Sequence, residues 1–360
     1  MKFKTLFLTA TLVLMLTGCG NAPETPTVPP ETTPPTTEAP VVEITLEGTT
    51  YGAETTSPTL TSTEGLADAI PCLSRLETVH FLQPECAPET LTQLRQDFPG
   101  ITFTWEKEVF GTTYPDSVTE IDLSGIPMED VTEAEALMGY FPDLEKLIMC
   151  GCGIDNETMA AFRDRAREQY KVVWSIQIRT LTVRTDETTF MPVKHDVFLF
   201  DNYTHDLVYL EDLIVLDLGH MPIYNIDFVR GMPHLQYLIV ADTMIRDIEA
   251  IADHKELVYL EIFKLNIDDY TPLLSCTALE DLNIAQTAGD PAVLAQMPWL
   301  KNLWMVQCGV SDENRQLLTE SLPNTRIEFD LGWTQGDNWR TLENYYKMRD
   351  LLEMPYNVWW

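Results

Sequence analysis

One apolar phrase recurs at a nearly constant interval in the second half of the chain, and it restricts the fold more than any other feature. The phrase has Leu at its first and fourth positions and an aliphatic residue or Met at its sixth. Its five clear copies are Leu213–Leu216–Leu218, Leu235–Leu238–Val240, Leu257–Leu260–Ile262, Leu279–Leu282–Ile284 and Leu300–Leu303–Met305. Their starts lie 22, 22, 22 and 21 residues apart. Because one such repeat is too short to bury its own apolar side, successive copies must stack into a solenoid.

The spacing within the repeat predicts where each side chain points. Alternate residues of a strand face opposite sides, so the leucines face the interior and the residues between them face outward. Weaker copies lie nearer the N-terminus, at Leu76–Val79–Phe81, Val118–Ile121–Leu123 and Leu144–Leu147–Met149, with a degenerate strand at Ser57–Thr61. The register is lost between Arg179 and Asp212, where Thr180–Arg184 and Val197–Phe200 are interpreted as strands of an irregular insertion.

The connections between the expected strands are of two kinds. Short ones such as Thr243–Ile251 suit extended or 3₁₀ turns. A longer one carries Met159, Phe162 and Ala166 on one helical face, which predicts an α-helix. The fold class expected from both is α/β, with a curved parallel sheet on one side and a helical or 3₁₀ convex side.

The N-terminus is typical of a secretion signal. Lys2 and Lys4 precede an apolar run, Leu6–Leu16, that is too short for a permanent membrane-spanning helix. The run is followed by Thr17-Gly18-Cys19, which resembles the bacterial lipobox. The resemblance implies a signal peptide over residues 1–18 and a lipid anchor on Cys19, which would hold the chain on the extracellular face of the cell membrane. The alternative is a signal in which the cysteine stands by chance.

A change of composition separates this N-terminus from the repeats. Residues 22–40 contain seven prolines, six threonines and three glutamates, with no basic residue. Such a segment cannot bury a core and stays extended. Residues 19–40 are therefore expected to form a lipidated, disordered stalk, which suits the thick wall of a Gram-positive host.

The charge of the chain restricts its partners. The formal net charge is −33, and loss of Lys2 and Lys4 with the signal would make it more negative. A strongly acidic surface disfavours nucleic acid and other polyanions as direct partners, and it also keeps a secreted protein soluble.

The repeats resemble those of the leucine-rich-repeat family. Cys152 and Cys308 stand three residues after the last apolar position, where the family consensus has Asn or Cys. The 22-residue copies, with Thr243, Ile245 and Asp247-Ile248, look like the internalin type of bacterial repeat. Together with the lipobox, these repeats make the chain resemble leucine-rich-repeat surface lipoproteins. The solenoid is expected over residues 41–331, with the insertion at about 179–212.

The resemblance implies a curved sheet whose concave face binds a partner, usually a protein. Carried over by position, the concave-face contact residues are Asp217, Tyr237, Ile239, Tyr259, Glu261, Phe263, Asn283, Asn302 and Trp304. Aromatic anchors beside acidic and amide groups suit protein recognition. Tyr and Trp also favour strands for structural reasons alone.

The last thirty residues are crowded with aromatic side chains. Residues 332–360 are expected to form a cap for the end of the solenoid, with a helix over Arg340–Met354. The alternative is a sugar-binding platform built around Trp333 and Trp339.

Neither the cysteines nor the histidines form a recognisable site of chemistry. Cys152, Cys276, Cys308 and His254 fall on core positions of the repeat, and a Cys72–Cys86 disulfide stays open. No metal-ligand spacing, nucleophile elbow or phosphate loop occurs, so we expect no metal, no cofactor and no enzyme activity. The expected function is protein recognition or adhesion at the cell surface. The alternatives are capture of glycans by a surface lipoprotein and a structural role in the envelope.

Overall fold

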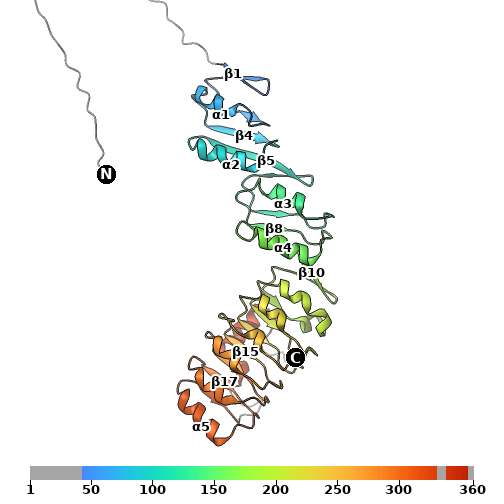
Figure 1. Cartoon of the computed structure of the whole chain (residues 1–360), viewed down its shortest axis with the longest axis vertical. Helices are drawn as coiled ribbons and strands as arrows, with labels where there is room; N and C mark the ends of the chain where they lie inside the picture. The colour runs from blue at the N-terminus through green and yellow to red at the C-terminus, as the bar shows by residue number, and fades with distance from the viewer. Residues whose placement is uncertain (1–42, 331–337, 356–360) are drawn as a thin grey trace, which may run out of the picture.

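Three sheets built mainly of parallel strands follow one another along an elongated chain in the computed structural model, which describes residues 43–330 and 338–355 (Figure 1). The largest sheet has seven strands in sequence order. They are β12 (Thr189–Phe190), β13 (Val215–Asp217), β14 (Tyr237–Ile239), β15 (Tyr259–Glu261), β16 (Asp281–Asn283), β17 (Asn302–Trp304) and β18 (Arg326–Glu328). Leu216, Leu238, Leu260, Leu282 and Leu303 are in register across β13 to β17, so the predicted repeat register is confirmed.

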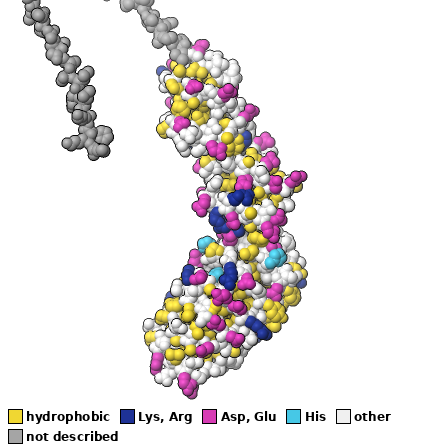
Figure 2. Space-filling model, in the orientation of Figure 1, with side chains coloured by type: hydrophobic (Ala, Val, Ile, Leu, Met, Phe, Trp, Pro, Cys, Tyr) yellow, Lys and Arg dark blue, Asp and Glu magenta, His cyan; other side chains and the backbone are white. Residues whose placement is uncertain are grey.

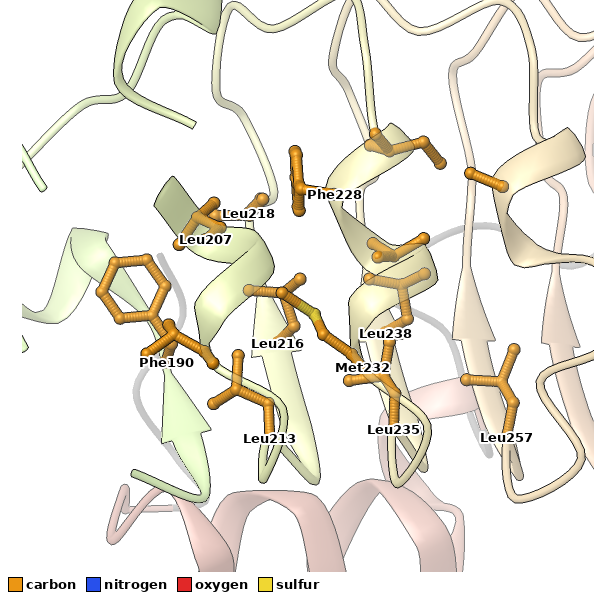
Figure 3. Close-up of a cluster of buried hydrophobic side chains, with 14 of the residues drawn as sticks. Phe190, Leu207, Leu213, Leu216, Leu218, Phe228, Met232, Leu235, Leu238 and Leu257 are labelled. Atoms are coloured by element: carbon orange, nitrogen blue, oxygen red, sulfur yellow. The ribbon is translucent and has the colours of Figure 1, made fainter. Parts of the chain in front are cut away.

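The leucines of the repeat form the core on one side of this sheet. The labelled side chains in Figure 3 show one layer per repeat, for example Leu213 and Leu216 followed by Leu235 and Leu238. All of these side chains are buried. The turns behind them are the predicted 3₁₀ helices: η5 (Asp227–Gly231), η6 (Glu249–Ile251), η7 (Thr271–Ser275) and η8 (Pro291–Gln296). A parallel sheet with one strand and one short turn per 22-residue repeat is a leucine-rich-repeat solenoid.

The N-terminal half uses longer connections. Its sheets are β3 (Thr59–Leu60), β4 (Thr78–Leu82), β5 (Thr102–Val109) and β6 (Thr112–Pro115), followed by β7 (Glu120–Asp122), β8 (Lys146–Ile148) and β9 (Lys171–Val173). Its helices are α1 (Leu66–Ala69), η1 (Ile70–Cys72), α2 (Pro88–Asp97), α3 (Thr132–Met138) and α4 (Asn156–Ala166), and α5 (Asp312–Ser321) is the corresponding helix before β18. The predicted helical connections and the strand at Ser57–Thr61 are therefore confirmed.

A β-hairpin recurs three times and divides the chain into modules. The hairpins are β1 (Glu43–Leu46) with β2 (Thr49–Gly52), the end of β5 with β6, and β10 (Ser175–Ile178) with β11 (Leu181–Arg184). Each has four antiparallel residue pairs closed by a two-residue turn. After each hairpin the chain enters a new parallel strand, β3, β7 or β12. The third hairpin is thus a regular part of the architecture.

Of the two strands predicted in the irregular segment at 179–212, Thr180–Arg184 is confirmed as β11 and the other is wrong. Val197–Phe200 is not a strand; Val197 and Leu199 are buried in the main core as the apolar positions of one more repeat. The 3₁₀ helices η2 (Pro192–His195), η3 (Asp201–Tyr203) and η4 (His205–Tyr209) complete that repeat. This repeat could not be recognised in the sequence because its strand, β12, contributes only Thr189 and Phe190 to the sheet.

The histidine and most of the cysteines that were predicted to be in the core are buried. His254 is buried and bonded to two carbonyl oxygens, those of Ile251 (3.0 Å) and Val229 (2.9 Å), so it is a structural histidine. Cys152 and Cys276 are buried as predicted, whereas Cys308 is half-buried. Cys72 and Cys86, whose pairing the sequence left open, are both free thiols.

No helix in the described ranges has the length and apolarity needed to cross a membrane.

Candidate functional site

The side of the large sheet opposite the leucine core, here called the outer face, carries the predicted contact residues. Asp217, Ile239, Glu261, Asn283 and Trp304 occupy the same register position on consecutive strands. Tyr237 and Tyr259 form a second row on neighbouring strands, with their ring centroids 6.4 Å apart. Five of the predicted residues belong to an apolar cluster separate from the leucine core, namely Tyr237, Ile239, Tyr259, Phe263 and Trp304. The alternation read from the sequence therefore placed them on the correct side.

The chain's own C-terminal segment (residues 338–355) covers this face. It consists of η9 (Trp339–Thr341) and α6 (Glu343–Leu351). Tyr345 lies 6.4 Å from Tyr259, and Trp339 lies 6.0 Å from Phe263, measured between ring centroids. Figure 3 shows a pale red helix of the C-terminal region on the side of the strands away from the labelled leucines. The predicted cap thus lies on the sheet and not at the end of the solenoid.

Polar contacts fix the segment in one position. Asn344 Nδ2 donates to Asp281 Oδ2 (3.0 Å) and to Glu280 Oε2 (3.2 Å), and Asn302 Nδ2 donates to Asp281 Oδ1 (2.7 Å). At the other end of α6, Lys194 Nζ donates to the carbonyl oxygen of Leu352 (2.8 Å). Because buried polar groups require partners with defined geometry, these bonds specify how the helix is oriented on the sheet.

The expectation that the predicted contact residues are open to a partner is therefore corrected. Tyr259 and Trp304 are only 1% and 2% exposed. Tyr237, Ile239, Glu261, Phe263 and Asn283 are also buried, while Asp217 and Asn302 are partly exposed. The sequence could not show this, because the distance along the chain between the strands and α6 conceals their contact.

A cavity of about 250 Å³ remains between the outer face and the C-terminal segment. Its apolar walls include Met191, Phe198, Ile239, Phe263, Met348 and Leu352. Its polar lining consists of Asp217, His220, Glu261, Arg340 and Arg349. Phe198 and His220 are exposed, so they lie where the cavity meets solvent. A mostly apolar hollow with a few convergent polar groups is the usual form of a ligand site.

Two strand carboxylates of the cavity have perturbed pKa values. Burial raises the pKa of Glu261 to about 7, opposed by a hydrogen bond from Tyr259, and the nearby Asp217 raises it further. Burial also raises the pKa of Asp217 to about 6, opposed by the backbone N–H of Gly219 and by the charges of His220 and Arg349. The charges of the cavity's arginines oppose these shifts, since Arg349 lowers the pKa of Asp217 and Arg340 lowers the pKa of Glu261.

A row of polar side chains follows the carboxyl ends of the strands, and its first member, His220, lines the cavity. His220, Asp242, Lys264, Gln286 and Gln307 occupy equivalent positions and all have positive φ, between 54° and 62°. His220 Nδ1 lies 2.9 Å from Asp242 Oδ2, and Lys264 Nζ lies 3.2 Å from the same oxygen. Backbone strain at non-glycine residues is often found at functional sites. The sequence signal for this row is the position two residues after each repeat's last apolar residue.

Exposed apolar side chains lie close to the same border. Phe198, Phe200, Tyr224 and Met244 are all at least 47% exposed. Phe198 and Phe200 alternate with the buried Val197 and Leu199, and the backbone of Tyr224 is bonded to Asp201, next to Phe200. Large apolar side chains grouped in this way on a surface mark an interaction site more often than scattered ones do.

The described residues of the cavity provide carboxyl, imidazole and guanidinium groups. Among its described lining residues there is no Ser, Thr or Cys that could act as a nucleophile. Within residues 43–330 and 338–355, no three His, Cys, Asp or Glu side chains are grouped to hold a metal ion. Asp217 and Glu261 stand on strands separated by β14, with Ile239 between them.

No protein-family model matches the chain, and no curated protein matches it. Three solved structures are similar: an internalin of Listeria monocytogenes (15% identity, TM-score 0.34), internalin C2 of the same species (16%, 0.33) and a leucine-rich-repeat protein of Leptospira interrogans (15%, 0.34). They cover 73%, 68% and 72% of this chain, which in turn covers 63%, 90% and 74% of theirs. The chain thus spans less than two thirds of the first internalin.

The assignment of the fold rests on the strand register and core of this chain. Both define a leucine-rich-repeat solenoid with 22-residue repeats.

Proposed function

We propose that this chain is a surface-anchored leucine-rich-repeat protein that recognises a protein partner through the border of its large sheet. The site comprises the cavity, the polar row from His220 to Gln307 and the exposed apolar residues around Phe198. The observation that carries this proposal is the covered outer face: since α6 occupies the centre of the sheet, a partner has access only to its border and to the cavity beside the helix.

The properties of this border suit protein recognition. It combines exposed aromatic side chains with hydrogen-bonding groups at fixed spacing, as interfaces commonly do. The outer face itself binds an amphipathic helix in cis through Tyr345 and Asn344. Helix-in-groove contacts of this kind are one of the common modes of peptide recognition.

The proposal includes attachment to the cell. The lipobox-like sequence ending at Cys19 and the Pro/Thr-rich residues 22–40 support a lipid anchor and a stalk on the extracellular face of a Gram-positive membrane. Both lie outside the described residues. Replacing Cys19 by Ala should release the chain from the membrane fraction, and retention at the wild-type level would contradict the anchor.

The glycan alternative has less support. Trp339, one of its two expected platform residues, is buried against Phe263 and so has no free face for a sugar ring. Trp333 lies outside the described residues.

Site-specific photo-crosslinking tests the proposed function. A photoreactive phenylalanine replaces Tyr224 at the border or, as the control, Arg230 in the exposed part of the convex turn η5. On intact cells exposed to candidate partner surfaces, we expect a discrete crosslinked protein from position 224 and none from position 230. Equal crosslinking from both positions, or crosslinking from position 230 alone, would contradict recognition through the border.

A further inference from the structure

The carboxylates at the floor of the cavity have a feature that protein recognition in general does not explain. Asp217 Oδ1 accepts a hydrogen bond from the backbone N–H of Gly219 (2.9 Å). Among the described residues, no hydrogen bond reaches its second oxygen. Glu261 stands two strands away on the same floor, is buried, and accepts a hydrogen bond from the Tyr259 hydroxyl. The cavity therefore contains two carboxyl groups, one of them with an unused acceptor, together with the guanidinium groups of Arg340 and Arg349, whose charges act on these carboxyls.

We propose that this cavity receives the side chain of a lysine presented by the protein partner. The inference rests on the proposed function and names the group that is recognised. The ammonium would lie at the free oxygen of Asp217, within the field of Glu261, and the four methylenes would lie along Phe198 and the apolar wall. A long side chain with a charged head buries its stem against apolar surface in this way.

The geometry favours lysine over arginine. A guanidinium pairs best with both oxygens of one carboxylate, in two parallel hydrogen bonds. One oxygen of Asp217 is already bonded to Gly219, and one oxygen of Glu261 is bonded to Tyr259. An ammonium has three rotatable donors, so it can bond a single oxygen of Asp217 and still lie close to a second carboxylate.

The charge of the whole chain points in the same direction. The formal net charge is −33, and acidic side chains are spread along the visible face of the molecule in Figure 2. Such a field attracts a basic partner and repels an acidic one. Arg340 and Arg349 also line the cavity and give the opposing alternative, an anionic ligand. Arg349 is bonded to the carbonyl oxygen of Pro355, and the Arg340 guanidinium lies 5.2 Å from the Trp339 ring centroid.

Titration calorimetry on the full chain tests the proposal with three matched probes. They are the Nα-acetyl methylamides of lysine, norleucine and glutamate, which differ only in the side chain. We expect the lysine probe to bind at least about tenfold more tightly than norleucine, because a hydrogen bond to a charged group is lost in the latter. The glutamate probe should not bind. Stronger binding of glutamate, or equal binding of lysine and norleucine, would overturn the proposal.

Two pairs of variants locate the binding. Asp217→Asn should weaken lysine binding about tenfold or more, whereas the exposed Asp268→Asn should leave it unchanged. Phe198→Ala should also weaken binding, whereas Phe200→Ala should not, because Phe198 lines the cavity and Phe200 does not, although they are 48% and 47% exposed. The phenylalanine pair keeps the test valid if Asp217→Asn fails to fold. Equal effects within both pairs would overturn the proposed location.

Two further outcomes distinguish a failure of the lysine inference from a failure of the proposed function. If a partner crosslinks at position 224 but Asp217→Asn does not weaken its capture, the proposed function holds and the lysine inference fails. Binding of n-butylamine with the same affinity as the lysine probe would show a site for free amines, which would also overturn a lysine presented by a protein.

Discussion

Two adjacent tyrosines of α6 provide a sharp test of the docking of the C-terminal segment. Tyr345 is 5% exposed and packs against Tyr259, whereas Tyr346 is 38% exposed. Burial of an aromatic side chain removes roughly 150–250 Å² from water. At about 25 cal/mol per Å² this corresponds to about 4–6 kcal/mol, an upper bound because the unfolded chain is already partly collapsed. Measured costs of replacing buried aromatics by Ala are about 3–5 kcal/mol.

We therefore expect Tyr345→Ala to cost about 3 kcal/mol and Tyr346→Ala to cost about 1 kcal/mol or less. The measurement is urea denaturation followed by circular dichroism, together with hydrogen exchange of α6. If α6 detaches before the solenoid unfolds, the full effect will appear in hydrogen exchange and only part of it in denaturation. Equal effects of the two substitutions in both measurements would refute the docking of α6 on the outer face.

Three further predictions concern the core, the buried acid and the thiols. Leu260→Ala should lower the free energy of unfolding by about 3–4 kcal/mol in urea denaturation, because Leu260 is buried at the centre of the stack. Met244→Ala at the exposed surface should change it by less than about 1 kcal/mol. Similar values for the two variants would show that the repeat register is wrong. Burial raises the pKa of Glu261 to about 7, above its ordinary 4.5, so the folded state prefers the protonated carboxyl. The contribution of the protonated Glu261 to stability is therefore fully present below pH 4.5 and is lost as the pH rises through 7. Between these limits wild type should lose up to about 3 kcal/mol more than Glu261→Gln, with the exposed Glu249→Gln following wild type, and parallel curves for all three would contradict the shift. The exposed Cys72 should be alkylated by a maleimide within the first minutes, whereas Cys276, which is buried and whose pKa is raised to about 11, should resist alkylation. Mass spectrometry of the peptides measures the alkylation of each thiol. Early alkylation of Cys276 would contradict its position in the core.

The repeat register could be predicted from the sequence because it depends on local spacing. Leu216, Leu238 and Leu260 each stand at the same place in a copy of one phrase, and any other register would expose them. The 3₁₀ turns followed from the short distance between strands. Thr180–Arg184 was predicted as a strand, but the hairpin that it forms was not recognised. The repeat around Leu199 was missed because β12 is short. The Gly-Thr-Thr-Tyr sequence shared by residues 48–51 and 111–114 was the available signal for the other two hairpins.

The accessibility of the site could not be predicted in this way. Alternation correctly placed Tyr237 and Tyr259 on the outer face, but their burial depends on α6, which is distant in sequence. The only sequence signal was the aromatic composition of the last thirty residues, which indicates burial without saying against what. The cavity likewise arises from the fit of two distant segments, so neither Asp217 nor Arg349 could be assigned to it beforehand.

The most direct test of the account is the contact between the C-terminal segment and the outer face in solution. In the full chain with selectively protonated aromatic residues, we expect nuclear Overhauser contacts between the rings of Tyr345 and Tyr259 and between those of Trp339 and Phe263, whose centroids lie 6.4 Å and 6.0 Å apart. The already buried pair Phe162 and Tyr170, at 6.4 Å, serves as the internal reference. A clear signal from the reference pair with none from the other two would contradict the covered outer face, and with it the placement of the recognition site at the border.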